Sequence, residues 1–331
     1  MIWSMEEKPE IVISTRVRLA RNLDKIPFPA LLKDKESVIN KIKDAVFKSN
    51  STLAEDFEDL ELSKLSATER MKLSERHLIS PQMFKNNVGD CLINKDKTMS
   101  IMIMEEDHIR QQVIKGGYCP EEAYELCNKL DDVLSESLSF AFDEKIGYLT
   151  SCPTNAGTGL RVSVMLHLPA LRLTGKINRI AASAANVGIA VRGYNGEGTD
   201  ADGCFYQISN QITMGATEKE IIERVKNVTD QIVSFEKDAR AEILNNNKPV
   251  IEDKLWRSYG TLKYARTITS KEAISLLSDV LLGVNLGIIT DKINMPIMEL
   301  IVSVQPGGIG GAEIPPEKRD IKRAEFLRKH L

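Results

Sequence analysis

The segment that most constrains the fold runs from Thr98 to Arg110. Its first seven residues are mainly apolar and predict a buried strand, which ends abruptly in ionisable side chains. These are Glu105, Glu106, Asp107, His108 and Arg110. Because three acids, an imidazole and a guanidinium cannot all be buried cheaply, we expect them to face a polar site. The alternative is a solvated loop whose acids pair with neighbouring cations, and the other strand ends decide between the two.

Residues 10–19 are rich in β-branched side chains and predict another strand that carries charge. Side chains alternate along a strand, so Arg16 and Arg18 project from one face. That face also carries Ser14, and the opposite face carries Ile13, Thr15, Val17 and Leu19. Two adjacent guanidinium groups repel unless an anion lies between them, and their planar shape suits a polyphosphate. An edge strand whose arginines extend into water is the alternative.

The region around the first cluster reads as helices and one hairpin. Residues 36–86 look helical and polar, and His77, which leaves this stretch, looks structural from the pattern alone. Residues 88–93 and 98–104 predict a hairpin that delivers the acidic cluster. Pro120 opens an amphipathic helix that we expect to reach about Phe142.

A third charged strand follows a loop of small residues. The loop contains Cys152, which is either a reactive thiol or a small buried hydrophobe. The strand after it places alternate residues on one face, namely Arg161, Ser163, Met165 and His167. Gly157 and Gly159 match neither a dinucleotide fingerprint nor a Walker A loop, because a strand follows them and no Gly-Lys-Ser/Thr does.

Residues 187–199 predict a fourth strand, which ends in Arg192. A loop follows in which glycines flank Glu197 on both sides, as in a tight or mobile loop that places an acid at a defined point. An ordinary surface turn that carries an acid is the alternative.

The remainder of the chain reads as helices. Thr217 and Glu220 form a capping box for a helix that we expect to end near Leu244. Further helices are predicted after Thr269 and over 296–304. Residues 305–311 are glycine-rich and predict a flexible loop with no phosphate role, and the charged tail that contains Arg319, Asp320 and Arg323 looks like a solvated helix. We expect a catalytic domain over 1–259 and a small helical domain over 260–331.

Composition limits the partners. With 44 Lys and Arg against 47 Asp and Glu, nothing in the net charge favours nucleic acid or an anionic membrane. Five cysteines without a Cys-x-x-Cys pair suit a reducing compartment, and no signal peptide or membrane-spanning run is evident. We expect a cytoplasmic protein.

Together these segments resemble the catalytic domain of the phosphagen (guanidino) kinases over roughly residues 10–240. The matching motifs, in order, are Ser14-Thr15-Arg16-Val17-Arg18, Glu105 to Arg110, Cys152-Pro-Thr-Asn155, Arg161-Val-Ser-Val and Arg192 to Glu197. The resemblance implies an α+β fold with an antiparallel sheet flanked by helices. It also implies ATP held by five arginines: Arg16, Arg18, Arg110, Arg161 and Arg192.

Within that family the chain is most similar to bacterial protein arginine kinases of the McsB type. These carry a C-terminal Arg-Asp-x-x-Arg-Ala motif, present here as Arg319-Asp320-Ile-Lys-Arg323-Ala. The resemblance implies that Arg319, Asp320 and Arg323 contribute to a phosphoarginine-binding pocket. One departure is Met104, where phosphagen kinases commonly have Asn.

The resemblance also implies the residues of the site. The nucleotide contacts would be Ser14, Thr15, Arg16, Val17, Arg18, His77, Arg110, Arg161, Val162, Ser163, Val164, Met165, Arg192, Gly193, Tyr194, Asn195 and Gly196. Glu106 and Glu197 would hold the target guanidinium and remove its proton, with Cys152 tuning it electrostatically and forming no covalent bond. We expect Mg²⁺ to be held by ATP oxygens and water, with no protein ligand.

The implied function is transfer of the γ-phosphoryl group of ATP to arginine side chains of proteins, marking them for Clp-type proteolysis. A homodimer, an activating partner and a Clp-type unfoldase are further implied. Two alternatives stay open: a kinase of small free guanidines, and an adaptor that reads phosphoarginine without catalysis. A metal-carboxylate oxidoreductase, suggested by Glu105-x-x-His108, needs two such motifs on helices and has one, at a strand end.

Overall fold

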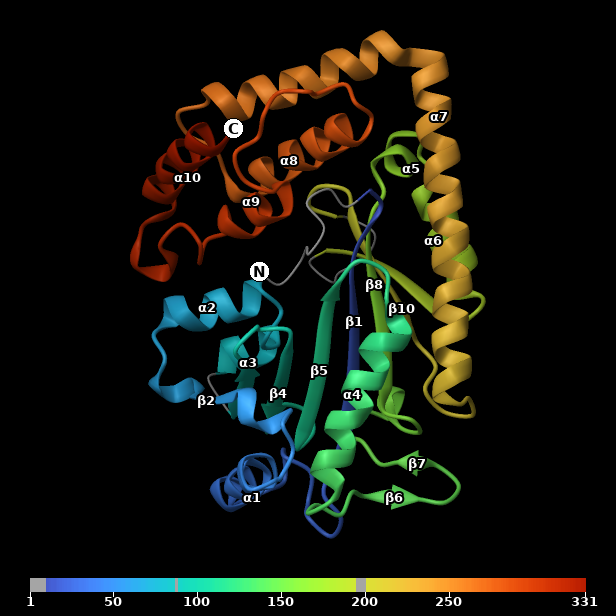
Figure 1. The fold of residues 1–331 in the computed structure, drawn as a ribbon, viewed down its shortest axis with the longest axis vertical. Coiled ribbons are helices and arrows are strands. Elements are labelled where there is room, and N and C mark those ends of the chain that lie inside the picture. The colour runs from blue at the N-terminus through green and yellow to red at the C-terminus, as the bar shows by residue number, and fades with distance from the viewer. Residues whose placement is uncertain (1–9, 87–88, 195–200) are drawn as a thin grey trace.

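The computed structural model describes residues 10–86, 89–194 and 201–331. Its centre is an eight-stranded antiparallel sheet in the order β2-β3-β4-β5-β1-β8-β10-β9 (Figure 1). The strands are β1 (Val12–Arg21), β2 (Phe57–Glu61), β3 (Asp90–Asn94), β4 (Met99–Ile103), β5 (Ile109–Gly116), β8 (Leu160–His167), β9 (Ile189–Gly193) and β10 (Phe205–Asn210). A separate hairpin consists of β6 (Phe142–Asp143) and β7 (Gly147–Tyr148). The predicted antiparallel sheet flanked by helices is confirmed.

Helices surround this sheet. They are α1 (Lys35–Phe47), α2 (Ala67–Glu75), α3 (Pro81–Asn86), α4 (Pro120–Ser135), α5 (Pro169–Leu173), α6 (Ile177–Ala185), α7 (Glu218–Tyr264), α8 (Ser270–Asn285), α9 (Ile297–Ser303) and α10 (Pro316–His330). Short 3₁₀ turns are η1 (Ala54–Asp56), η2 (Leu62–Lys64), η3 (Pro153–Asn155) and η4 (Gly311–Glu313). No helix of the described residues is both long and apolar enough to cross a membrane.

The two faces of the sheet differ in chemistry. On β1, Val17 and Leu19 are buried in the main apolar core, which α4 and α7 close on that side. Asp131 of α4 ties that helix to the same face through an ion pair with Arg21 at 2.8 Å. On the opposite face, α2 and α3 cover the part formed by β3 to β5 with a second apolar cluster. The face is left polar over β1, β8 and β10, where the arginines lie.

Two predicted elements in the first half of the chain are wrong in extent. The helical interpretation of residues 36–86 misses β2, whose sequence Phe-Glu-Asp-Leu-Glu has little apolar alternation and which is held as an edge strand by β3. The helix from Pro120 ends at Ser135 instead of near Phe142. It ends early because the backbone that follows pairs with the chain after β1, through Asp24 N to Ser139 O and Ala141 N to Asn22 O.

α7 is longer than predicted. Its capping box of Thr217 and Glu220 is confirmed, but the helix runs on to Tyr264 and does not end near Leu244. The Asn-Asn-Asn-Lys-Pro sequence produces only a kink, with Asn247 in a non-helical conformation (φ −144°) two residues before Pro249. The helix continues because its buried face resumes beyond the kink, with Leu255 and Tyr259 in the core.

The C-terminal helices gather at one end of the sheet. Figure 1 shows α8, α9 and α10 beneath the second half of α7, above α2 and the upper ends of the strands. Thr269 caps α8 as predicted, accepting a hydrogen bond from Glu272 N at 3.2 Å. Nε2 of His167 in β8 lies 2.8 Å from Oγ of Ser278 in α8, so this region packs directly on the sheet.

Candidate active site

Strand register brings three arginines into neighbouring positions on the polar face. Arg18 of β1 lies opposite Arg161 of β8, and Arg110 of β5 lies opposite Ala20, two residues further along β1. Paired residues of an antiparallel sheet share a face, so all three side chains project to the same side. Arg16 lies on that face one step in the other direction, opposite Ser163.

Arg192 is the fifth arginine of this group. It lies on β9, which β10 separates from β8. It lies opposite Gln207, whose side-chain oxygen accepts a hydrogen bond from Arg16 Nη2 at 3.0 Å. Burial, with the charges of Arg110 and Arg161, lowers the pKa of Arg16 to about 10. Burial, with the charges of Arg192 and Arg110, lowers that of Arg161 to about 10.

We call Arg16, Arg18, Arg110, Arg161 and Arg192 the arginine row. The positive charges of this row repel one another. Burial and the charges of Arg16, Arg110 and Arg161 hold the pKa of Arg18 well below its ordinary value. Among the described residues, the Nε atoms of Arg18 and Arg161 are buried and have no hydrogen-bond partner. Buried like charges with unused donors are stabilised by an anion that accepts from several of them at once, as a polyphosphate does.

A small pocket lies at one end of the arginine row. It is lined by Ser14, Arg16, His77, Ser163, Met165 and Gln207. His77 reaches it from the turn after α2, in a left-handed conformation (φ 57°), and its carbonyl accepts a hydrogen bond from Gln112 Nε2 at 2.6 Å. Burial and the charges of Arg16 and Arg18 lower the pKa of His77 to about 3, so the imidazole is neutral at physiological pH.

The loop between β4 and β5 lies at the other end of the row. Asp107 is buried, and its Oδ1 accepts from Asn22 Nδ2 at 2.6 Å and from Ser151 N at 2.7 Å. His108 accepts from Leu23 N through Nδ1 and donates from Nε2 to the Pro27 carbonyl, both at 3.0 Å. These two residues hold the loop in place, and His108 has no ring nitrogen left for a metal.

The two glutamates of this loop differ in their surroundings. Glu105 forms an ion pair with Arg110, and only 2% of its side chain is exposed. Glu106 is half-buried, and desolvation is the main cause that raises the pKa of its carboxyl group. Within the ranges that the structure describes, no group of three or more His, Cys, Asp or Glu side chains is arranged to hold a metal ion.

The loop that contains Cys152 is bonded to the loop that contains Glu106. The link is Asp107, which follows Glu106 and accepts the hydrogen bond from Ser151, the residue before Cys152. Cys152 is half-buried, with its Sγ 3.0 Å from Thr154 Oγ1, so it is not an inert core residue. Two loops that are 44 residues apart in sequence thus meet at the end of the arginine row.

Some predicted residues lie elsewhere. Thr15, Val17, Val162 and Val164 are fully buried on the opposite face of the sheet, and their contact with nucleotide stays a prediction. Glu197, Asn195 and Gly196 lie outside the described residues, whereas Gly193 ends β9 beside Arg192. Sequence analysis missed Gln112 and Gln207. Alternation could have placed each glutamine on a face, but the bond from Gln112 to His77 and the bond from Arg16 to Gln207 are tertiary contacts that appear only in the structure.

The C-terminal motif is more buried than a solvated helix would be. Arg323 is 2% exposed, and its guanidinium donates to Val304 O at 2.6 Å, Ile268 O at 2.8 Å and Asp320 Oδ1 at 2.5 Å. Arg319 is half-buried and donates to Gly311 O at 2.8 Å. The interpretation of Arg323 as a solvated charge is wrong, and a phosphoarginine-binding role for the motif stays a prediction.

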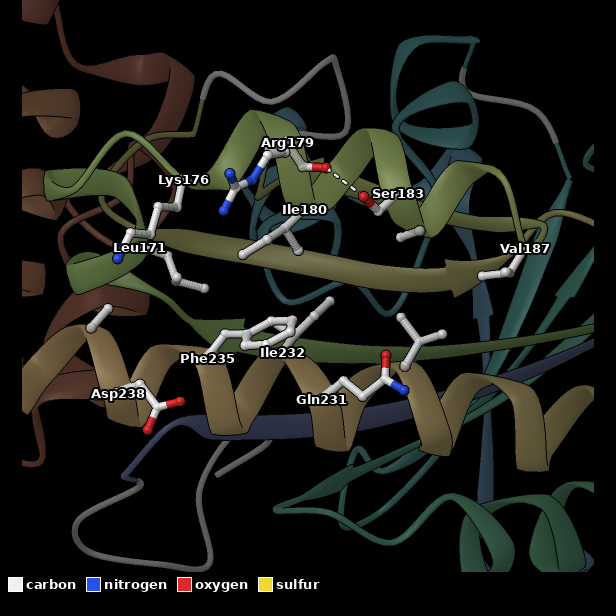
Figure 2. A pocket seen from close by; sticks show the side chains of 13 residues that line it. Leu171, Lys176, Arg179, Ile180, Ser183, Val187, Gln231, Ile232, Phe235 and Asp238 are labelled. Atoms are coloured by element: carbon white, nitrogen blue, oxygen red, sulfur yellow. Dashed lines mark hydrogen bonds between the residues drawn. The ribbon is translucent and has the colours of Figure 1, made fainter.

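A second pocket lies on the far side of the sheet. Figure 2 shows Ile232 and Phe235 of α7 facing Ile180 of α6, with Lys176, Arg179 and Asp238 near its edges. The described residues of its walls are mainly apolar and include neither Glu106 nor any of the five arginines. Its chemistry does not suit phosphoryl transfer, so the arginine face is the candidate site.

Comparison with known families agrees with this geometry. Residues 37–239 match the ATP:guanido phosphotransferase C-terminal catalytic domain, and residues 248–331 match the protein-arginine kinase McsB C-terminal domain. A protein-arginine kinase of Caldanaerobacter subterraneus subsp. tengcongensis is 45% identical over 331 residues, which cover 97% of each chain. Those of Brevibacillus brevis and Bacillus subtilis are 44% and 42% identical, covering 99% of this chain and 94% and 93% of their own.

Solved structures share the fold. A lombricine kinase superposes with a TM-score of 0.62 at 24% identity, over 72% of this chain and 69% of its own. A duplicated taurocyamine kinase of Schistosoma mansoni, with bound transition state analog components, gives a TM-score of 0.60 at 26% identity, over 77% of this chain and 39% of its own. The chain belongs to the ATP:guanido phosphotransferases and, within them, to the protein-arginine kinase family.

Proposed function

We propose that this chain transfers the γ-phosphoryl group of ATP to arginine side chains of proteins. The observation that carries the proposal is the row of arginines on one face of the sheet, with the pocket beside the neutral His77 at one end and Glu106 and Cys152 at the other. A triphosphate suits the middle of such a row, and its base would then lie beside His77 at the pocket end. The reacting phosphoryl group would then lie beside the acidic loop.

The dimensions of the sheet support this orientation. From Ser14, beside the pocket, to Ala20, opposite Arg110, β1 advances six residues, which is about 20 Å at the usual strand rise. Arg16, Arg18 and Arg161 lie between these points. A nucleotide extended along β1, with its base beside His77, would present its phosphates to each arginine in turn.

The acceptor is a guanidinium, which is a poor nucleophile because it stays protonated. Glu106 and Glu197 would accept hydrogen bonds from its N–H groups and fix its orientation. As the N–P bond forms, the bond from the γ-phosphorus to the bridging oxygen breaks, ADP leaves, and the nitrogen proton passes to one carboxylate. Cys152 would stabilise the positive charge of the guanidinium without bonding to it.

Mg²⁺ would neutralise phosphate charge during the transfer. The described side chains on the arginine face are mostly cationic or neutral, so they are poor ligands for a hard cation. We therefore infer that ATP oxygens and water hold the ion. The chain's own contribution is to position the reactants and to supply the arginine field.

Incubation with Mg-ATP separates the candidate functions. An arginine-rich protein, free arginine and creatine are offered in parallel, and phosphate is located by mass spectrometry under non-acidic conditions. We expect acid-labile phosphate on arginine residues of the protein. Turnover of the free guanidines alone would favour a small-guanidine kinase. Binding of phosphoarginine without any transfer would favour an adaptor.

The C-terminal motif would bind phosphoarginine as the second element of this function. Arg319 is the better residue for a test, since Arg323 also holds the backbone at Val304 and Ile268. The homodimer, the activating partner, the Clp-type unfoldase and the cytoplasmic location stay predictions that rest on resemblance.

A further inference from the structure

The loop Gln305–Gly311, which we call the glycine loop, joins the C-terminal region to the nucleotide side of the sheet. Sequence analysis assigned it only flexibility, but its backbone lies directly on α2. Gly307 N donates to both carboxylate oxygens of Glu75, at 2.8 and 3.1 Å. α10 holds both ends of the loop, because Arg323 bonds to Val304 O and Arg319 to Gly311 O.

The glycines permit this close approach. A Cβ atom on Gly307 would lie 2.5 Å from Glu75 Oε2, and one on Gly311 would lie 2.1 Å from Thr68 Oγ1. Gly311 also has a φ of 68°, which side chains rarely adopt. The loop is therefore fitted to α2 and is not a free linker.

The same loop contacts the wall of the nucleotide pocket. Gln305 is 8% exposed, and its Nε2 donates to the Tyr194 hydroxyl at 2.9 Å. The Tyr194 ring packs edge-on against the His77 ring, with centroids 5.5 Å apart. Glu75, at the other contact of the loop, is two residues before His77 in the chain. The glycine loop thus bonds directly to Tyr194 and, through Glu75, to the segment that carries His77.

We propose that Gln305 is a positioning residue for the nucleotide base, which it places through Tyr194 and His77. The proposal rests on the proposed function, since it requires ATP to bind with its base in this pocket. It makes a residue of the C-terminal region part of the nucleotide site without contact with the reacting atoms. Loss of the hydrogen bond should loosen the His77–Tyr194 wall and weaken recognition of the base alone.

The test compares ATP with inorganic tripolyphosphate, which has phosphates but no base. Gln305→Leu removes the donor at similar volume, and Tyr194→Phe removes the acceptor. We expect each variant to weaken ATP binding about three- to tenfold, which is the effect of one neutral hydrogen bond. Tripolyphosphate affinity should not change, and the double variant should be no weaker than either single one. Gly307→Ala disturbs the contact of the loop with Glu75 and should also weaken ATP binding.

The controls separate this inference from simpler explanations. Gln231→Leu changes an exposed glutamine in the pocket between α6 and α7 and should leave both affinities unchanged. Equal losses for ATP and tripolyphosphate in Gln305→Leu would show a merely structural role and overturn the proposal, as would wild-type ATP affinity. Failure of the unmodified chain to bind ATP at all would instead contradict the proposed function.

Discussion

Glu106 is the residue on which the proposed chemistry depends most closely. Burial raises the pKa of its carboxyl group above the ordinary glutamate value, so the ionised form, which would orient the guanidinium and could accept its proton, is lost at a higher pH than in a free glutamate. We expect kcat/KM to fall as pH is lowered, with a midpoint above about 4.3. Glu106→Gln should lower transfer by on the order of 10²-fold or more without changing folding.

A pH–rate profile of both proteins checks this prediction. The acid limb should be present in the unmodified chain and absent from the residual activity of Glu106→Gln. Unchanged turnover in the variant would remove Glu106 from the mechanism.

Arg18 illustrates a conflict between stability and binding. Its charge is disfavoured in the folded chain by burial and by three neighbouring arginines, which is why its pKa is lowered. Arg18→Met removes the charge and keeps much of the length, so we expect the free energy of unfolding without ligand to rise by on the order of 1 kcal/mol. ATP affinity should fall at least about tenfold, because a charge-assisted contact is lost.

Urea unfolding with and without Mg-ATP measures both effects at once. Ligand binding should stabilise the unmodified chain more than the variant, by mass action. Arg179→Met, at an exposed arginine on the far side of the sheet, is the matched control. A variant that is less stable without ligand and binds ATP normally would contradict the account of the arginine row.

At the scale of elements, the loop 104–108 acts through Asp107. One carboxylate oxygen joins this loop to the turn after β1 and to the Cys152 loop. Asp107→Ala leaves two donors without their acceptor, so we expect a loss of about 2 kcal/mol in the free energy of unfolding and a lower kcat. Asp107→Asn keeps an oxygen at the same point and should retain most of both. Equal behaviour of the two variants would show that the hydrogen bonds are not what positions the loops.

The sequence predicts the strands that carry the site better than it predicts the contacts between them. Alternation along β1 and β8 correctly places Arg16, Arg18 and Arg161 on polar faces, because strand geometry is local. It cannot show that Arg18 lies opposite Arg161, since register depends on contacts between distant segments. The role of His77 came from resemblance alone, because its left-handed turn and its bond from Gln112 are tertiary features.

At the scale of the whole molecule, the two predicted regions share one core. A single apolar cluster includes Val17 of β1 and Leu277 of α8, and α7 crosses residue 259 without ending. We therefore expect one cooperative unfolding transition in calorimetry, with equal calorimetric and van't Hoff enthalpies. Two separate transitions would show that the regions fold independently and that the glycine loop is a weak contact.

The kink of α7 shows why the end of a helix is hard to predict from composition. The run Asn-Asn-Asn-Lys-Pro has the composition of a linker, yet burial of Ile251 and Leu255 keeps the chain helical beyond it. The glycine loop misleads in the same way, since close packing on α2 requires the same glycines that a flexible loop would have.

The most direct test is a crystal structure of the chain with Mg-ADP and an arginine-containing peptide. We expect the phosphates to contact Arg16, Arg18 and Arg161, with the base beside His77. We also expect the Glu106 carboxylate to accept hydrogen bonds from the peptide guanidinium at about 2.7–3.2 Å. Phosphates bound away from these arginines, or a guanidinium out of reach of Glu106, would refute the proposed mechanism.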